Sequence, residues 1–153
     1  MARRYFSVDE VNQLVPELEA IFARVMRLRA QLKSIYRRLE AVGFAPSGEH
    51  FTPEVPGAPP ETVRDRGAFK ALTELLRTEL AAISELGCQV KDIETGLVDW
   101  FAIDPRVDGE VFLCWRFGEK EVAFYHDLES GFAGRRPVSE LQAPPPQKPR
   151  TLH

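Results

Sequence analysis

The stretch that decides the fold is EVFLCWRFGEKEVAFYHD, residues 110–127. Its two halves, 110–117 and 120–127, follow a period of two and are separated by Gly118-Glu119. A glycine in the first central position suits a type II′ turn, which joins the two strands of a hairpin through a two-residue loop. This stretch therefore predicts a pair of antiparallel strands.

The turn also predicts the register of the hairpin, because it pairs Phe117 with Lys120. One face of the hairpin then becomes apolar, and opposite charges meet on the other face. The predicted pairs are Trp115 with Val122, Leu113 with Phe124 and Val111 with His126 on the apolar face, and Arg116 with Glu121, Cys114 with Ala123 and Phe112 with Tyr125 on the other.

A second hairpin is predicted just before this one, from strands over residues 88–93 and 97–103. A three-residue loop between them places Lys91 opposite Asp99 as a cross-strand ion pair. A two-residue turn instead places Asp92 opposite Asp99, and two close carboxylates raise one pKa or bind a cation. We favour the ion pair, because the glycine between the strands suits the left-handed position of the longer loop.

The N-terminal part of the chain predicts a long helix. Ser7 and Glu10 fit a capping box, and Pro16 predicts a kink or a restart of the helix. Beyond the proline, apolar residues recur at alternating spacings of four and three, which is the pattern of a coiled-coil-like seam. The seam consists of Leu18, Ile21, Val25, Leu28, Leu32, Ile35, Leu39 and Val42.

A second helix is predicted over residues 61–86, with Gly87 at its C-terminal cap. The Pro-rich segment 43–60 has no periodicity and predicts a loop, so the two helices should pack as an antiparallel hairpin. A helical hairpin followed by an antiparallel sheet of about four strands gives the α+β class. The broad apolar face of the second helix consists of Phe69, Leu72, Leu75, Leu76, Leu80, Ile83 and Leu86.

We expect a single α+β domain over residues 1–142. It comprises the helical hairpin (7–86), a β-meander (88–127) and a Gly/Arg loop (128–142). The Pro-rich segment 143–153 predicts a disordered tail of the polyproline type. The rest of the chain is long enough for one hydrophobic core without disulfides or metals.

The composition argues against several classes of protein. Lys and Arg number 20 against 23 Asp and Glu, a net charge of −3, which argues against a protein that binds mainly phosphate backbones. No stretch approaches the roughly 20 apolar residues of a membrane-spanning helix, and the first residues lack the apolar core of a secretory signal. Cys88 and Cys114 therefore suggest free thiols in a reducing cytoplasm, where we expect inert packing residues.

The first predicted helix is rich in basic residues: Arg24, Arg27, Arg29, Lys33, Arg37 and Arg38. Nucleic-acid binding would need these side chains on one face, but their positions scatter around the helix. An antiparallel partner helix offers acids at matching positions. We therefore favour ion pairs between the helices or simple solvation, with Arg38 beside Asp65, Arg29 beside Glu74 and Arg24 beside Glu79.

Two further features suggest chemistry. His126 is either a partly buried histidine hydrogen-bonded to a neighbour, which we favour, or a ligand or acid–base group. The spacings typical of closed zinc sites are missing from the sequence. The loop SGFAGRR, residues 130–136, is either a solvated turn, which we favour, or an anion site in which glycine amides and two arginines approach the ligand.

Several segments are specific enough to indicate a family. They are GCQVKD (87–92), GLVDW (96–100), LCWRFGE (113–119), the stretch from His126 through GFAGR (131–135), and YFSVDEVN with LVP (5–12 and 14–16). With these motifs the chain resembles a bacterial family known as domain of unknown function 2203, over about residues 5–138 without the Pro-rich loop. One departure is Trp100-Phe101, where the family has Phe-Pro. The resemblance implies a small bacterial protein and no particular activity.

Six polar residues inside these motifs are our candidates for a ligand site: Lys91, Asp92, Asp99, Glu119, His126 and Arg135. We expect a non-enzymatic interaction or small-ligand-binding module of the bacterial cytoplasm, which forms a homodimer or binds a protein partner through its helical hairpin. The alternative is a metal-dependent, hydrolase-like enzyme that uses Asp92, Asp99 and His126. The sequence assigns no catalytic residue and no cofactor.

Overall fold

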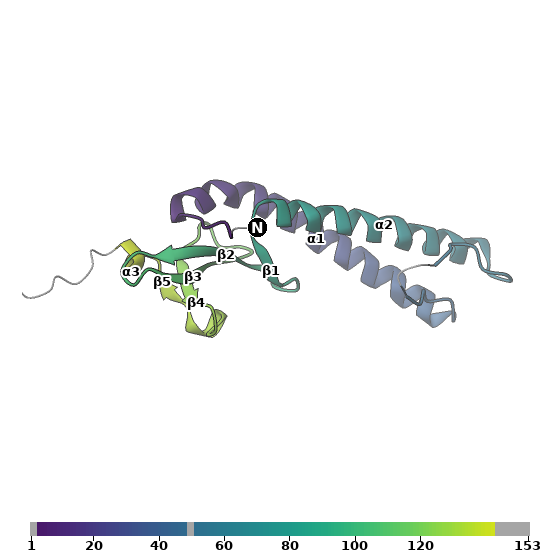
Figure 1. Cartoon of the computed structure of the whole chain (residues 1–153). Coiled ribbons are helices and arrows are strands. Elements are labelled where there is room, and N and C mark those ends of the chain that lie inside the picture. The colour runs from purple at the N-terminus through teal and green to yellow at the C-terminus, as the bar shows by residue number, and fades with distance from the viewer. Residues whose placement is uncertain (1–2, 49–50, 143–153) are drawn as a thin grey trace, which may run out of the picture. The chain divides into compact units, whose positions relative to one another are not determined.

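The computed structural model describes residues 3–48 and 51–142, and the predicted Pro-rich tail lies outside these ranges (Figure 1). The α+β class is confirmed, because the long helices α1 (Val8–Ala41) and α2 (Pro60–Glu85) precede an antiparallel sheet. The chain divides into two compact units. One contains the residues up to Glu19 and those from Ile83 onward, and the other is Ala20–Ala82. None of the described helices is long and apolar enough to cross a membrane.

The start of α1 confirms the predicted capping box. Ser7 Oγ accepts the backbone N–H of Glu10, and the Glu10 carboxylate accepts the backbone N–H of Ser7, both at 3.1 Å. The helix does not restart at Pro16, which lies inside a single 34-residue helix. The first turns of α1 bury Val11 and Leu18 completely, so this end of the helix is fixed by its cap and by apolar packing.

In the unit Ala20–Ala82 the two helices are joined by two of the ion pairs expected from the sequence. Arg24 Nε lies 2.8 Å from Glu79, and Arg38 Nη2 lies 2.9 Å from Asp65. The hydrogen bonds from Arg38 hold the pKa of Asp65 below its ordinary value. The matching of basic residues on one helix with acidic residues on the other therefore specified the antiparallel pairing.

The Pro-rich loop between the helices is held by one buried arginine. Arg66 donates to the backbone carbonyl oxygens of Phe44 at 2.6 Å, Thr52 at 2.9 Å and Pro53 at 3.3 Å. The described residues of this loop, 43–48 and 51–59, form neither helix nor strand, as the sequence predicted. One side chain thus satisfies carbonyl groups from two separate parts of the loop.

The sheet has five antiparallel strands in sequential order, one more than the roughly four expected (Figure 1). A short 3₁₀ turn, η1 (Phe132–Gly134), precedes the last strand, and a short helix, α3 (Ser139–Gln142), follows it. The strands are β1 (Gln89–Asp92), β2 (Leu97–Asp104), β3 (Gly109–Arg116), β4 (Phe124–Asp127) and β5 (Arg136–Pro137).

One face of the sheet packs against the first turns of α1 and forms a hydrophobic core. Trp100, Leu113 and Trp115 are fully buried there. The Trp100 indole N–H donates to the backbone carbonyl of Leu86 at 3.1 Å. Burial of these large side chains contributes to the stability of this unit.

The predicted register of the β3–β4 hairpin is wrong by one residue. His126 lies opposite Phe112, and Val111 lies opposite Asp127. Because successive side chains in a strand point to opposite faces, a slip of one residue moves a side chain across the sheet. His126 therefore lies on the face opposite to the one predicted.

The whole connection between the strands, rather than its tight turn alone, explains this slip. The backbone N–H of Glu119 donates to the carbonyl of Arg116 at 3.0 Å, so the central residues are Phe117 and Gly118, one position earlier than predicted. Gly118 has a φ of 101°, which suits glycine at the third position of a type II turn. The return strand β4 begins only at Phe124, which pairs with Cys114. The residues between the turn and Phe124 lengthen the connection, so the register differs from that of a hairpin with a two-residue loop.

Both predicted pairings of the β1–β2 hairpin are also wrong. Asp99 lies opposite Gln89, rather than opposite Lys91 or Asp92. The register shifts between Val90 and Asp92, as in a β-bulge. A bulge adds one residue to one strand, and the sequence carried no clear signal for it.

Candidate functional site

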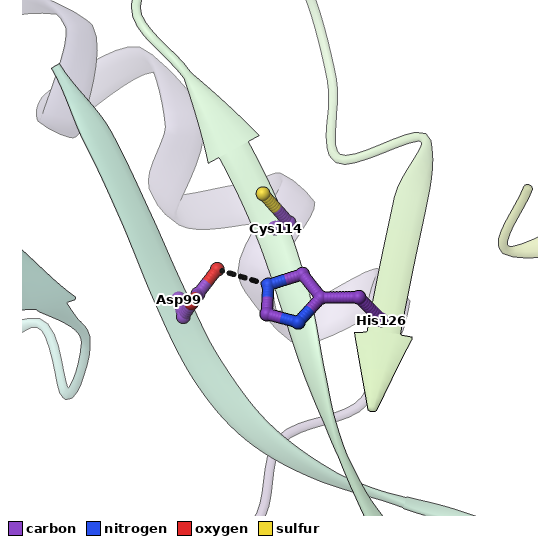
Figure 2. Close-up of side chains that lie close together, drawn as sticks. All are labelled: Asp99, Cys114 and His126. Carbon is purple, nitrogen blue, oxygen red and sulfur yellow. Dashed lines mark hydrogen bonds and ion pairs between the residues drawn. The ribbon is translucent and has the colours of Figure 1, made fainter. Parts of the chain in front are cut away.

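Three side chains that are distant in sequence meet on the second face of the sheet: Asp99 from β2, Cys114 from β3 and His126 from β4 (Figure 2). Asp99 lies directly opposite Cys114. His126 lies opposite Phe112, two residues before Cys114 on the same strand. Residues directly opposite each other, and residues two apart in one strand, share a face. The strand pairing alone thus gathers the three side chains.

This cluster is buried and its polar atoms converge. The exposed fraction is 2% for Asp99, 0% for Cys114 and 3% for His126. One carboxylate oxygen, the thiol sulfur and one ring nitrogen all lie within 4.8 Å of one another. Figure 2 shows His126 Nε2 directed at Asp99 Oδ1, 3.1 Å away. Such buried polar groups are stable only when they satisfy one another or hold an ion.

The backbone of β4 fixes the orientation of the histidine ring. His126 Nδ1 lies 2.7 Å from the carbonyl oxygen of Asp127. Because a carbonyl oxygen only accepts, Nδ1 carries a hydrogen and Nε2 is left facing the cluster. Burial lowers the pKa of His126, but the hydrogen bonds to Asp99 and to the Asp127 backbone outweigh burial and raise it above its ordinary value.

The thiol of Cys114 is protonated near neutral pH. Burial and the neighbouring negative charge of Asp99 raise its pKa to about 12, and its hydrogen bond goes to Asp99. A nucleophilic cysteine needs the histidine ring as its base. Here the available ring nitrogen faces Asp99, so the arrangement does not fit a Cys–His nucleophile. It does fit a set of sulfur, nitrogen and oxygen ligands for one metal ion.

The structure separates the predicted acidic candidates. It brings Asp99 and His126 together and leaves Asp92 out of the cluster. Asp92 is exposed, and its carboxylate accepts the backbone N–H of Glu94 at 3.0 Å in the turn. Lys91 is exposed as well, with its ammonium 4.7 Å from the ring centroid of Phe112, the residue opposite His126.

Glu119 and Arg135 form a pair of their own. Arg135 Nη2 donates to both carboxylate oxygens of Glu119, at 2.7 and 2.9 Å. Glu119 also accepts the backbone N–H of Arg116 at 2.6 Å. The guanidinium of Arg135 lies 4.1 Å from the ring centroid of Phe124, the residue opposite Cys114. Glu119 therefore positions Arg135 beside the cluster and does not itself join it.

Cys114 is the residue of the site that sequence reasoning missed. We expected an inert packing thiol, on the face opposite to His126. The strand pairing decides this. When His126 pairs with Phe112 instead of Val111, Cys114 lies on the same face as His126, two residues from Phe112 along β3. The sequence did not reveal this register, so it did not reveal the third member of the cluster.

Comparison with known proteins identifies a family and no characterised relative. Residues 4–138 match a family described as "Uncharacterized conserved protein (DUF2203)". No curated protein matches the chain, and no solved structure matches it. The matched range covers the sheet and both long helices, including all three residues of the cluster.

Proposed function

The chain belongs to the DUF2203 family, and we propose that it is a small metal-binding module whose sheet holds one zinc-class divalent ion through Asp99, Cys114 and His126. The observation that carries this proposal is the convergence of three buried ligand atoms of different chemistry within 4.8 Å. A thiolate, an imidazole and a carboxylate are ligands that zinc takes in proteins.

The balance of charge supports a divalent ion. Thiolate and carboxylate together carry two negative charges, and the neutral imidazole carries none. A divalent cation with these three ligands is therefore neutral as a group, and a neutral group is the least costly to keep out of water. Binding would release the thiol proton of Cys114 and the proton shared between His126 Nε2 and Asp99, because each ligand atom needs a free lone pair.

The orientation of His126 also supports the proposal. A histidine that ligates a metal through one nitrogen usually donates the other N–H to a carboxylate or a backbone carbonyl. The hydrogen bond from Nδ1 to the Asp127 carbonyl has this form. It directs Nε2 to the centre of the cluster in advance of binding.

We propose a binding module rather than a metal-dependent hydrolase. The three cluster residues are at most 3% exposed, and a hydrolase must admit both a substrate and a water molecule to its metal. The set of three protein ligands still leaves one position of a tetrahedral ion for a small ligand.

The experiment is a titration of chelator-treated protein with Co²⁺, which gives a thiolate-to-cobalt absorption band when cysteine is a ligand. We expect one ion per chain, loss of this band in Cys114→Ala and its retention in Cys88→Ala. Cys88 is a matched control, because it is also buried and its thiol hydrogen-bonds to the Ile83 carbonyl. Wild-type protein that takes up no cobalt, or a band that persists in Cys114→Ala, would contradict the proposal.

We also propose that the helical hairpin, Ala20–Ala82, associates with a second copy of this chain. Leu75 is 53% exposed and lines, with Leu28, a groove of about 300 Å³. The same groove is lined by Arg27 and Glu79, so its rim carries both signs of charge. A two-fold axis sets the apolar part of this groove against the same groove of the second copy.

Native mass spectrometry tests this association. We expect a dimer for the wild type and a monomer for Leu75→Glu, because a charge in the groove opposes burial of the surface. Val107→Glu is the control, since Val107 is also an exposed apolar residue but lies in the turn after β2, outside the hairpin. A monomeric wild type would refute the proposal.

A further inference from the structure

Arg135 is held rigidly beside the cluster. Its guanidinium lies 4.1 Å from the ring centroid of Phe124 and 4.6 Å from that of Phe132, and its Nη2 is bound by both oxygens of Glu119. The side chain is only 12% exposed. Rings and carboxylate together leave the guanidinium little freedom to turn away.

One donor of this rigid group is unused. Arg135 Nε is buried and has no hydrogen-bond partner among the residues that the structure describes. A buried donor without a partner is rare in folded proteins, and it costs more when the group is charged. An unused donor of this kind marks a place where an acceptor from outside the chain belongs.

The guanidinium that carries this donor stacks on a ring beside the cluster. Phe124, on which Arg135 stacks, is the direct neighbour of Cys114 across the strands, and the positive charge of Arg135 acts on the thiol. A second cation, Lys91, lies over Phe112, the direct neighbour of His126. Two positive side chains therefore lie over rings that adjoin two of the three metal ligands.

A small hollow opens beside residues that lie two positions from the cluster along β2 and β3. It has a volume of about 210 Å³, and its lining consists of Asp92 at the end of β1, Thr95 in the following turn, Leu97, Arg116 and Phe132. Leu97 is two residues before Asp99 on β2, and Arg116 is two residues after Cys114 on β3. This space is large enough for a small anion, and its lining carries one cation, Arg116, and one carboxylate, Asp92.

We infer that the fourth position of the metal takes a small oxyanion, a carboxylate or a phosphate, whose oxygen accepts a hydrogen bond from Arg135 Nε. The inference rests on the proposed metal site and names its ligand. Charge-assisted hydrogen bonds from arginine to such oxygens are short and strong. The cations Arg135 and Lys91 beside the cluster favour one negative charge at this position.

Cobalt-loaded protein tests the inference, because the visible bands of Co²⁺ respond to a change of ligand. We expect acetate or inorganic phosphate to shift these bands in the wild type. Loss of one charge-assisted hydrogen bond should weaken anion binding about tenfold or more in Arg135→Gln, and Arg135→Lys should fall between. Arg136→Gln is the matched control, because this neighbouring arginine is exposed and lies 3.9 Å from Glu140.

The outcomes separate the two proposals. Cobalt binding without any response to either anion overturns the oxyanion inference and leaves the metal site standing. Equal anion affinity in Arg135→Gln and Arg136→Gln also overturns it. Absence of cobalt binding overturns both. If Arg135→Gln does not fold, Lys91→Met replaces it. Lys91 is exposed, and loss of its charge should also weaken anion binding.

Discussion

The buried pair Asp99–His126 allows a sharp prediction for the metal-free protein. The two side chains are 3.1 Å apart and at most 3% exposed. We consider the leucine variant of each residue and the double variant, all treated with a chelator. Leucine is chosen because it fills space without polar atoms, so the changes report on the polar pair itself.

The two single variants should differ in cost. In Asp99→Leu the imidazole loses its proton easily near neutral pH and leaves one buried nitrogen unsatisfied, which costs about 1–3 kcal/mol. In His126→Leu a buried carboxylate loses its partner. Protonating an aspartate at pH 7 costs about 4 kcal/mol, so we expect a loss of about 3–5 kcal/mol. The double variant removes both polar groups and should be no less stable than His126→Leu alone.

Urea unfolding at pH 7, followed by circular dichroism, gives the free energies of unfolding for this cycle. The reasoning is refuted if the two single variants lose the same amount, or if their losses simply add in the double variant. Equal losses would contradict the different charge states assigned to the two lone side chains, and additive losses would mean that the two side chains do not interact strongly across the 3.1 Å contact.

Four other predictions concern stability. Folding raises the pKa of His126. Its contribution to stability should therefore be complete below about pH 6.5 and vanish as the pH rises through the pKa of the folded state. Thermal melts from pH 5 to 9 in which the melting temperature does not fall would contradict this. Ser7→Ala should cost about 1 kcal/mol through loss of the helix cap, whereas the exposed helical Ser84→Ala should cost nearly nothing in the same urea assay. Arg66→Lys should leave loop carbonyls unsatisfied and speed limited proteolysis between residues 43 and 60, and an unchanged cleavage rate would show that Arg66 does not hold the loop. Trp100→Phe should cost about 2–4 kcal/mol, because it shrinks a fully buried side chain and leaves a backbone carbonyl without its donor; a loss below about 0.5 kcal/mol would count against this packing.

The sequence predicted the helical part of the fold in detail. The capping box, the C-terminal glycine of α2 and the ion pairs between the helices were all read from the residues. These features depend on contacts within a few residues, or on two regular helices whose positions advance at the same rate. A local rule is therefore enough to predict them. Gly87, for example, has the positive φ that a C-terminal cap requires.

The sheet was predicted as a class but not in register, and the site depends on the register. The β-bulge after Val90 and the extra residues between the Gly118 turn and Phe124 each moved the pairing. Which turn forms is decided partly by distant contacts, such as the hydrogen bond from the Val122 N–H to Asn12 of α1. Since a slip of one residue carries a side chain to the other face, only the tertiary structure could unite Cys114 with Asp99 and His126. The sequence by itself determined which residues lie in helices and strands and which of them are polar, and the packing of the sheet decided which of the polar ones meet.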